Sequence, residues 1–198
     1  MDGSTVRIGV FGGTFDPPHI GHLAVAAECR TALHLDRVLL VVAGEPWQKV
    51  GEREISPAPI RLDLTRTAVS PYPGLECSDI EVRRPGPSYT ADTLRALSAE
   101  HPGAELFVIL GADAARGLPT WERVDEVMQA STLVVCARDG GFGDLPVGVG
   151  WREVTVPRLD VSSTDLRDRV AAGRSIDVLV SPETALSIRR HGLYRGAR

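Results

Sequence analysis

Short apolar runs alternate with segments of helical periodicity along the chain. The strongest runs lie at residues 6–11, 38–43, 106–110 and 133–137. Continuous apolar runs of this length predict strands that are buried on both faces. Weaker runs at 75–82 and 151–156 predict two more strands. The alternation predicts an α/β fold with a largely parallel sheet.

Helices are expected between these runs. Ile20, Leu23, Ala24 and Ala27 recur at helical spacing and predict a helix that ends near residue 33. Ser56-Pro57 predicts an N-cap followed by the first residue of a second helix. Further helices are expected from Thr90, which we expect to be an N-cap, around 121–128, from Ser162 or Ser163, and from Pro182. The polar segment 44–55 and the glycine-rich segment 139–150 are expected to be loops, and we assign no function to the second.

Composition narrows the class of protein. A chain of 198 residues with 43% hydrophobic residues predicts one domain, residues 1–198, with a sizeable core. The net charge of -4 gives no basic field for nucleic acid or an anionic membrane. Cys29, Cys77 and Cys136 lack metal or CxxC spacing and lie in apolar contexts, so we expect reduced core residues. No basic leader or transmembrane-length run is present, and we expect a cytoplasmic protein. Homo-oligomer formation stays open.

Lysine usage excludes several phosphate chemistries. Of 22 lysine and arginine residues, 21 are arginine and Lys49 is the single lysine. Because Lys49 is followed by Val50, it cannot belong to a Walker A loop, and a signature that needs two lysines is also excluded. Lys49 is either a solvated surface residue or a charge kept for a site.

Residues 12–22, Gly-Gly-Thr-Phe-Asp-Pro-Pro-His-Ile-Gly-His, join the first predicted strand to the first predicted helix. An open α/β sheet binds ligands at such a junction, and the N–H groups of a helix start favour phosphate. His19 and His22 are three residues apart and project from one face, with Gly21 leaving space beside them. The alternative is a tight turn whose histidines are cap or surface residues.

Residues 12–22 also resemble sequence motifs of known enzyme families. His19-Ile20-Gly21-His22 resembles the HxGH motif that nucleotidyltransferases share with class I aminoacyl-tRNA synthetases. Residues 12–22 as a whole resemble the N-terminal signature of bacterial nicotinate-nucleotide adenylyltransferases. The chain is too short for a synthetase and lacks its lysine signature. Pantetheine-phosphate adenylyltransferases typically carry Thr where this chain has His19.

Three later segments extend the resemblance to this family. Residues 88–94 resemble its SYTxDTL segment, and residues 111–113 with 118–121 resemble its GAD and LPxW segments. Residues 161–167 resemble its ISSTxxR segment. The resemblance therefore runs from the first predicted strand to the penultimate predicted helix. It implies a Rossmann-like open, mostly parallel sheet with helices on both faces.

The resemblance also implies an activity, the transfer of AMP from ATP to nicotinate mononucleotide, with Mg²⁺ accompanying ATP. The residues implied for ATP are Gly12, Gly13, Thr14, Phe15, His19, Gly21, His22, Ser162, Ser163, Thr164 and Arg167. Those implied for the mononucleotide are Asp16, Lys49, Tyr89, Thr90, Asp113 and Trp121. Those implied for catalysis are His19, His22, Lys49 and Arg167. The C-terminal helical part, about 162–194, is expected to complete the ATP site.

Each segment also has a physical interpretation of its own. The amides of Tyr89 and Thr90 lie at a predicted helix start that suits a carboxylate, and Trp121 offers a plane for a pyridine ring. Asp113 follows a strand end and suits ribose hydroxyls, and Arg167 lies one turn behind a serine-rich helix start that suits phosphate. Ordinary caps and a core tryptophan are the alternatives.

Two other functions stay open. One is nucleotidyl transfer to a different phosphorylated acceptor, such as nicotinamide mononucleotide or phosphopantetheine. The other is a regulatory protein that binds nucleotide on the same fold without catalysis.

Overall fold

The computed structural model describes residues 5–46, 55–137 and 141–195. Its centre is a six-stranded sheet in the order β3-β2-β1-β4-β5-β6, in which every neighbouring pair is parallel. The strands are β1 (Arg7–Gly13), β2 (Arg37–Val42), β3 (Leu75–Ser78), β4 (Glu105–Gly111), β5 (Thr132–Ala137) and β6 (Arg152–Thr155). All six predicted strands are present, which confirms the α/β fold. The strand expected within 75–82 occupies Leu75–Ser78, after which the chain turns.

In the described residues the six predicted helices are present with small shifts at their ends, and a short seventh helix, at Ala112–Arg116, was not predicted. They are α1 (Ile20–Ala32), α2 (Ala58–Val69), α3 (Thr90–Glu100), α4 (Ala112–Arg116), α5 (Val124–Ala130), α6 (Ser163–Ala171) and α7 (Pro182–Arg190), with a 3₁₀ turn η2 (Leu118–Thr120). Ser162 caps α6 by accepting the N–H of Asp165 at 3.1 Å.

Three predicted helix starts need correction. Thr90 is the first residue of α3, and the N-cap position belongs to Tyr89. Helix α2 begins one residue after Pro57, which occupies its N-cap. Trp121 ends the 3₁₀ turn instead of opening α5, because Arg123 adopts a left-handed conformation with φ of 54° and separates the two. A left-handed residue interrupts a helix that apolar spacing alone would continue.

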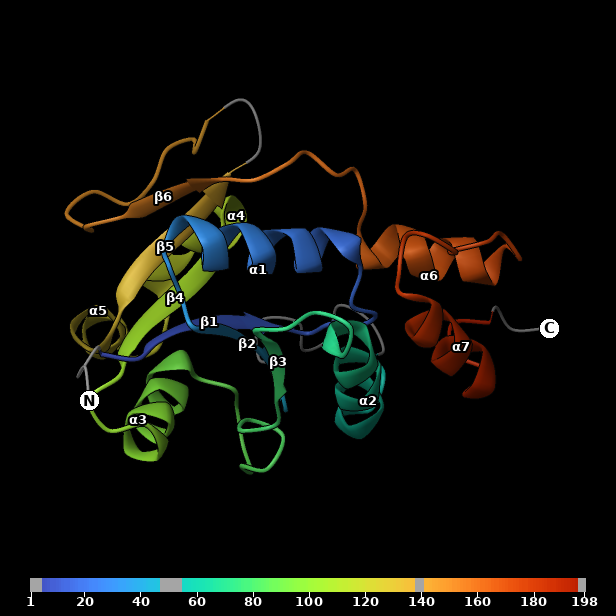
Figure 1. Ribbon diagram of the computed structural model, residues 1–198, viewed down its shortest axis with the longest axis horizontal. Helices are drawn as coiled ribbons and strands as arrows, with labels where there is room; N and C mark the ends of the chain where they lie inside the picture. The colour runs from blue at the N-terminus through green and yellow to red at the C-terminus, as the bar shows by residue number, and fades with distance from the viewer. Residues whose placement is uncertain (1–4, 47–54, 138–140, 196–198) are drawn as a thin grey trace.

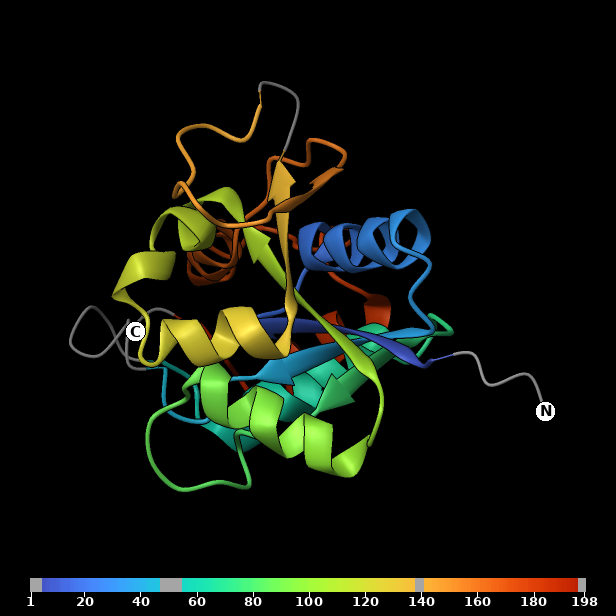
Figure 2. The ribbon, with the colours of Figure 1, turned by 90° about the vertical axis from the view of Figure 1, so that its left-hand side faces the viewer.

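The sheet separates two hydrophobic layers. Val38, Leu40 and Val42 of β2 pack in one cluster with α1 and α2, whereas Leu39 and Val41 pack in a second cluster with α3, α4 and α5. This alternation follows from the two-residue period of a strand. Figure 2 shows α1 on one side of the sheet and α3 and α5 on the other. The predicted helices on both faces are therefore confirmed.

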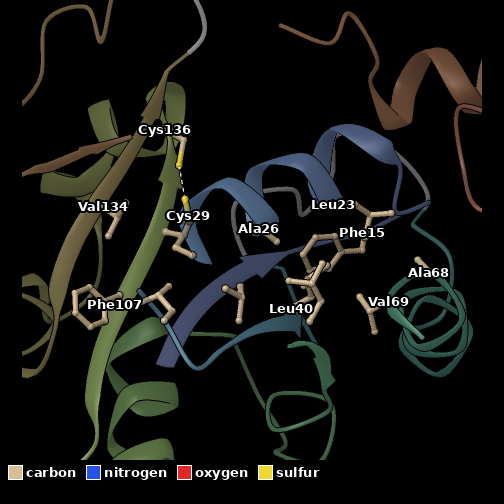
Figure 3. Close-up of a cluster of buried hydrophobic side chains, with 14 of the residues drawn as sticks. Phe15, Leu23, Ala26, Cys29, Leu40, Ala68, Val69, Phe107, Val134 and Cys136 are labelled. Carbon is tan, nitrogen blue, oxygen red and sulfur yellow. Dashed lines mark hydrogen bonds between the residues drawn. The ribbon is translucent and has the colours of Figure 1, made fainter. Parts of the chain in front are cut away.

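The first of these clusters also reaches the loop behind β1. Phe15 is 2% exposed and packs with Leu23, Leu40 and Val69 beneath α1 and α2 (Figure 3). Cys29 and Cys136 meet in the same cluster with 3.2 Å between their sulfur atoms, and all three cysteines are free thiols, as expected. An aromatic ring buried in the core fixes the loop that carries the candidate site.

The C-terminal helices form a separate cluster. Leu166 of α6 and Ile188 of α7 pack with Leu64 of α2. Figure 1 shows α6 and α7 beyond the end of the sheet toward which β1 points, with α6 beginning near the start of α1. In the part of the chain that the structure describes, no helix is long and apolar enough to cross a membrane.

Candidate nucleotide-transfer site

A cavity of about 170 Å³ lies at the carboxyl ends of β1, β2 and β4. In an open parallel sheet this is the expected ligand position, since the strand order reverses direction between β1 and β4. Six residues predicted from the sequence line it: Gly12, Gly13, Thr14, Tyr89, Thr90 and Trp121. Apolar walls come from strand residues such as Val10, Val41 and Leu110. The cavity has the mixture of apolar walls and few polar groups that small-molecule sites show.

The glycines of the first loop serve different purposes. A Cβ on Gly12 would meet nothing within 4 Å, so this position leaves open space for a ligand. A Cβ on Gly13 would lie 2.7 Å from the Phe15 ring, and one on Gly21 would lie 3.0 Å from the His19 ring. Gly13 and Gly21 are therefore required by aromatic neighbours, whereas Gly12 fits the expected approach of a ligand.

The start of α3 faces the cavity. Tyr89 adopts an extended conformation at the N-cap, so the first helical amides follow it directly. Asp92 binds Arg123 in a bidentate ion pair, with distances of 2.8 and 2.6 Å, and Arg123 also lies over the Tyr89 ring. The hydrogen bonds from Arg123 hold the pKa of Asp92 below its ordinary value. This pair connects α3 to the segment that carries Trp121.

Glu81 is a lining residue that the sequence motifs did not indicate. Its side chain is buried and accepts a hydrogen bond of 2.6 Å from the Thr93 hydroxyl. Burial raises the pKa of Glu81, while hydrogen bonds from Thr93 and Ser88 act in the opposite direction. The Ser88 hydroxyl in turn accepts the backbone N–H of Gly44 at 3.0 Å. An acidic residue between Ile80 and Val82 was the signal in the sequence.

The two histidines lie together at the start of α1. Their rings stack with 3.7 Å between centroids, and the Phe15 ring meets His22 edge-on at 5.0 Å. The backbone N–H of His19 donates to Nδ1 of His22 at 3.2 Å. Because Nδ1 accepts, the proton of the His22 ring lies on Nε2, which makes Nε2 its donor. The geometry thus favours a neutral His22, although phosphate alone would favour the cation.

Helix α6 begins against the same loop. Ser163 donates to the carbonyl of Pro17 at 2.8 Å, across 146 residues of sequence. Arg167 donates to the carbonyl of Asp16 at 2.8 Å and to the Thr164 hydroxyl at 2.9 Å. The fold therefore brings Ser163, Thr164 and Arg167 to the histidine loop, as the resemblance implies.

Asp16 lies deeper than expected. It is 1% exposed and is not among the residues that line the cavity. Its carboxylate accepts from the Tyr194 hydroxyl at 2.6 Å and from the Ser56 N–H at 3.3 Å. Burial and the adjacent carboxylate raise the pKa of Tyr194, so its hydroxyl keeps the proton that it donates. In this structure Asp16 holds the loop to the C-terminal part of the chain.

Asp113 is not among the residues that line the cavity. Asp113 lies in the first turn of α4 with a side chain that is 98% exposed, and it pairs with Arg116. It directly precedes Ala114, which lines the cavity. Lys49 lies outside the described residues.

Arg61 of α2 is a further buried polar residue that the motifs did not indicate, and its position three residues before Leu64 on the buried helix face was the available signal.

Comparison with known proteins agrees with this geometry. A family model described as "Cytidylyltransferase-like" matches residues 10–169. A protein of Roseiflexus sp. (strain RS-1), named "Probable nicotinate-nucleotide adenylyltransferase", is 45% identical over 201 residues, which cover 97% of this chain and 100% of that protein. A protein with the same name from Thermus thermophilus is 44% identical over 191 residues, which cover 96% of this chain and 100% of that protein.

The chain belongs to the nicotinate-nucleotide adenylyltransferase family. This confirms the resemblance that begins at residues 12–22. The fold of the family is also found in a solved structure of nicotinic acid mononucleotide adenylyltransferase from Plasmodium falciparum complexed with NaAD. The two structures agree with a TM-score of 0.77 at 17% identity, over 96% of this chain and 97% of that one.

Proposed function

We propose that this enzyme transfers AMP from MgATP to nicotinate mononucleotide, giving nicotinate adenine dinucleotide (deamido-NAD) and pyrophosphate in NAD biosynthesis. The observation that carries the proposal is the cavity that joins the glycine loop Gly12–Thr14 to the start of α3 and to Trp121. The part around Trp121 suits a flat ring, and Gly12–Thr14 belong to the loop that continues to the paired histidines.

The pyridine ring is assigned to the cavity between α3 and Trp121. Its carboxylate is held by the amides of Tyr89 and Thr90, because a helix N-terminus offers N–H groups and partial positive charge. Trp121 stacks on the ring. Asp113, which precedes the cavity-lining Ala114, is assigned to the ribose hydroxyls, while Asp16 supports the mononucleotide from within the loop.

The reaction is a direct in-line attack by the mononucleotide phosphate on the α-phosphorus of ATP. The attacking oxygen is already anionic, so neither a general base nor a covalent enzyme intermediate is required. Catalysis then rests on positioning and on stabilisation of charge. His22 donates from Nε2 to the α-phosphate oxygens, an assignment that its Nδ1 contact supports. His19 flanks the same phosphate, and Gly21 leaves room for its ring.

The β- and γ-phosphates are assigned to the start of α6. Ser162, Ser163 and Thr164 supply amides and hydroxyls there, and Arg167 supplies a guanidinium. The C-terminal part, about 162–194, thereby completes the ATP site. Lys49 is proposed as an additional charge for the triphosphate.

Mg²⁺ enters as part of the substrate MgATP. Among the described residues no group of three or more His, Cys, Asp or Glu side chains could hold a metal ion. The donors that are present fit a metal carried by phosphates and water, which is the usual arrangement for Mg²⁺ with a nucleotide. Bound in this way, Mg²⁺ offsets the charge of the triphosphate. The free thiols support a location in the reducing cytoplasm.

The proposal is tested by offering MgATP with nicotinate mononucleotide, nicotinamide mononucleotide or phosphopantetheine in parallel. We expect equimolar dinucleotide and pyrophosphate, fastest with nicotinate mononucleotide. Product with phosphopantetheine alone would assign the enzyme to a different acceptor. Nucleotide binding without pyrophosphate release from any acceptor would indicate a regulatory protein.

A further inference from the structure

Arg61 is the largest side chain that the described part of the chain buries completely, with 1% exposure. It lies in α2, on the face that packs against the sheet and the C-terminal helices. Burying a guanidinium is costly unless hydrogen bonds satisfy its donors. Its contacts therefore show what the fold uses it for.

The guanidinium of Arg61 binds three backbone carbonyls from three segments of the site. It donates to Thr14 at 2.9 Å, to Gly44 at 3.2 Å and to Ser56 at 2.8 Å. Thr14 belongs to the glycine loop that lines the cavity. Gly44 and Ser56 lie on either side of the segment 45–55. One buried side chain thus connects the glycine loop to both ends of the neighbouring segment.

These contacts fix the direction of the peptide groups in the glycine loop. In a trans peptide the carbonyl of one residue and the N–H of the next point in opposite directions. The Gly13 carbonyl accepts from Ala43 at 2.9 Å, so the Thr14 N–H points away from β2. The Thr14 carbonyl accepts from Arg61, so the Phe15 N–H points away from the guanidinium.

Two further carbonyls of the loop are turned aside as well, although the residues that follow them, Pro17 and Pro18, carry no N–H. The carbonyls of Asp16 and Pro17 accept from Arg167 and Ser163. Four carbonyls between Gly13 and Pro17 are thus engaged by protein donors. A loop that binds an anion has to turn its carbonyl oxygens aside and present N–H groups. Arg61 turns the Thr14 carbonyl aside in this way, in the loop that leads to the two histidines at the start of α1.

We propose that Arg61 is a positioning residue for the phosphates that react at the glycine loop, the mononucleotide phosphate and the α-phosphate of ATP. It draws the Thr14 carbonyl into the protein and so directs the Phe15 N–H toward these phosphates. It also holds Gly44 and Ser56 at fixed distances from the glycine loop. The inference rests on the proposed function, because it assigns the Phe15 amide to the reacting phosphates.

Two substitutions separate the charge of Arg61 from its geometry. Arg61→Lys keeps a positive charge, but its donors all lie on one nitrogen and cannot reproduce the planar fork whose three nitrogens each reach a different carbonyl. Arg61→Met keeps much of the volume and loses both features. Arg66→Met is the matched control, because Arg66 lies on the same helix, is exposed, and pairs only with Asp79 among the contacts that the structure gives it. Circular dichroism establishes folding, and binding is compared well below each unfolding midpoint.

The probes isolate the contribution of phosphate. Nicotinate riboside carries the ring without phosphate, and nicotinate mononucleotide carries both. Their affinity ratio is the increment that the phosphate supplies. Tripolyphosphate carries no ring and tests phosphate binding even if nicotinate mononucleotide is not the acceptor. A failure of the proposed function would therefore appear in the wild-type product assay and not in this comparison.

We expect Arg61→Lys to reduce the phosphate increment and the affinity for tripolyphosphate by about tenfold or more, the size of one or two charge-assisted hydrogen bonds. Affinity for nicotinate riboside should stay within about twofold of wild type, because the ring cavity is unchanged. Arg61→Met should lose at least as much, and Arg66→Met should lose nothing. An unchanged phosphate increment in folded Arg61→Lys would overturn the proposal, and so would an equal loss for riboside and mononucleotide.

Discussion

The two proposed regions of the site are assembled from the chain in different ways. We call the cavity assigned to the pyridine ring the ring cavity, and the histidine loop together with the start of α6 the phosphate end. The cavity is lined by strand residues, by the start of α3 and by Trp121, and its buried acid, Glu81, belongs to a local network with Thr93. The phosphate end is assembled from residues far apart in sequence, among which Arg61, Ser163 and Arg167 bind carbonyls of the same loop. On the proposed assignment, the cavity selects its ligand by shape and by the direction of the α3 amides, whereas the phosphate end depends on polar side chains that hold the loop backbone.

The histidine at the phosphate end should show the largest effect. His22→Ala removes the Nε2 donor and should lower kcat/KM by about a hundredfold to a thousandfold, the cost of losing one donor to developing charge. His22→Asn keeps a side-chain acceptor near the His19 N–H and should lose a similar factor with less loss of stability. Steady-state kinetics and thermal unfolding of both variants measure this. Near-normal turnover in either variant would remove His22 from the mechanism.

The second-largest effect is expected for Arg167, on the KM for ATP. Arg167→Lys keeps the charge but loses the planar fork that binds Asp16 and Thr164 together. The KM for ATP should rise by about tenfold, because a bidentate group is replaced by a point charge. The KM for nicotinate mononucleotide should change less. Arg169→Lys on the same helix is the control, and an equal rise of both KM values would count against a triphosphate role.

Trp121 tests the ring cavity itself. Trp121→Ala should raise the KM for nicotinate mononucleotide by about tenfold, as expected for a lost stacking contact. The KM for ATP should stay close to wild type, and Trp121→Phe should recover much of the loss. If the alanine variant affects both substrates equally, the ring does not stack on this residue.

Glu81 should show the smallest effect, on stability and its dependence on pH. Its pKa is raised by burial, so the folded protein binds this proton more tightly than the unfolded chain does. Stability from this group is therefore present below the ordinary Glu pKa of about 4.3 and is lost as pH rises through the folded-state value. Glu81→Gln cannot ionise and should gain melting temperature relative to wild type as pH rises.

Thermal unfolding of both proteins from acidic to mildly alkaline pH measures this difference. Glu76→Gln on the adjacent strand β3 is a surface control. A difference between Glu81→Gln and wild type that does not grow with pH would contradict a carboxyl group that is costly to ionise.

The two regions also differ in how far the sequence predicts them. All six strands follow from the local hydrophobic pattern, and the cavity-lining Tyr89, Thr90 and Trp121 follow from the resemblance, because each belongs to one of its motif segments. Arg61 and Glu81 were not predicted, because a charged residue inside an apolar stretch does not reveal which carbonyl or hydroxyl it meets. The helical placement of Trp121 failed for a related reason, since only tertiary contacts fix the left-handed Arg123.

Asp16 is a residue whose contacts in the structure differ from the one that the motif predicts. Its place in the motif suggests a ligand contact, yet its carboxylate binds Tyr194, which lies 178 residues further along the chain. The motifs therefore identify which loops form the site. They do not tell which polar residues of those loops meet the ligand and which hold the loop.

The most direct test of the division between the two regions is a double-mutant cycle on kcat/KM with His22→Ala and Trp121→Ala. If ring binding and phosphate chemistry are separate, the losses multiply, and the double variant should fall within about twofold of the product of the single losses. We predict that the Trp121 substitution acts on the KM for the mononucleotide and the His22 substitution on kcat. A double variant no worse than His22→Ala alone would contradict the division, because it would show that both residues act through one step.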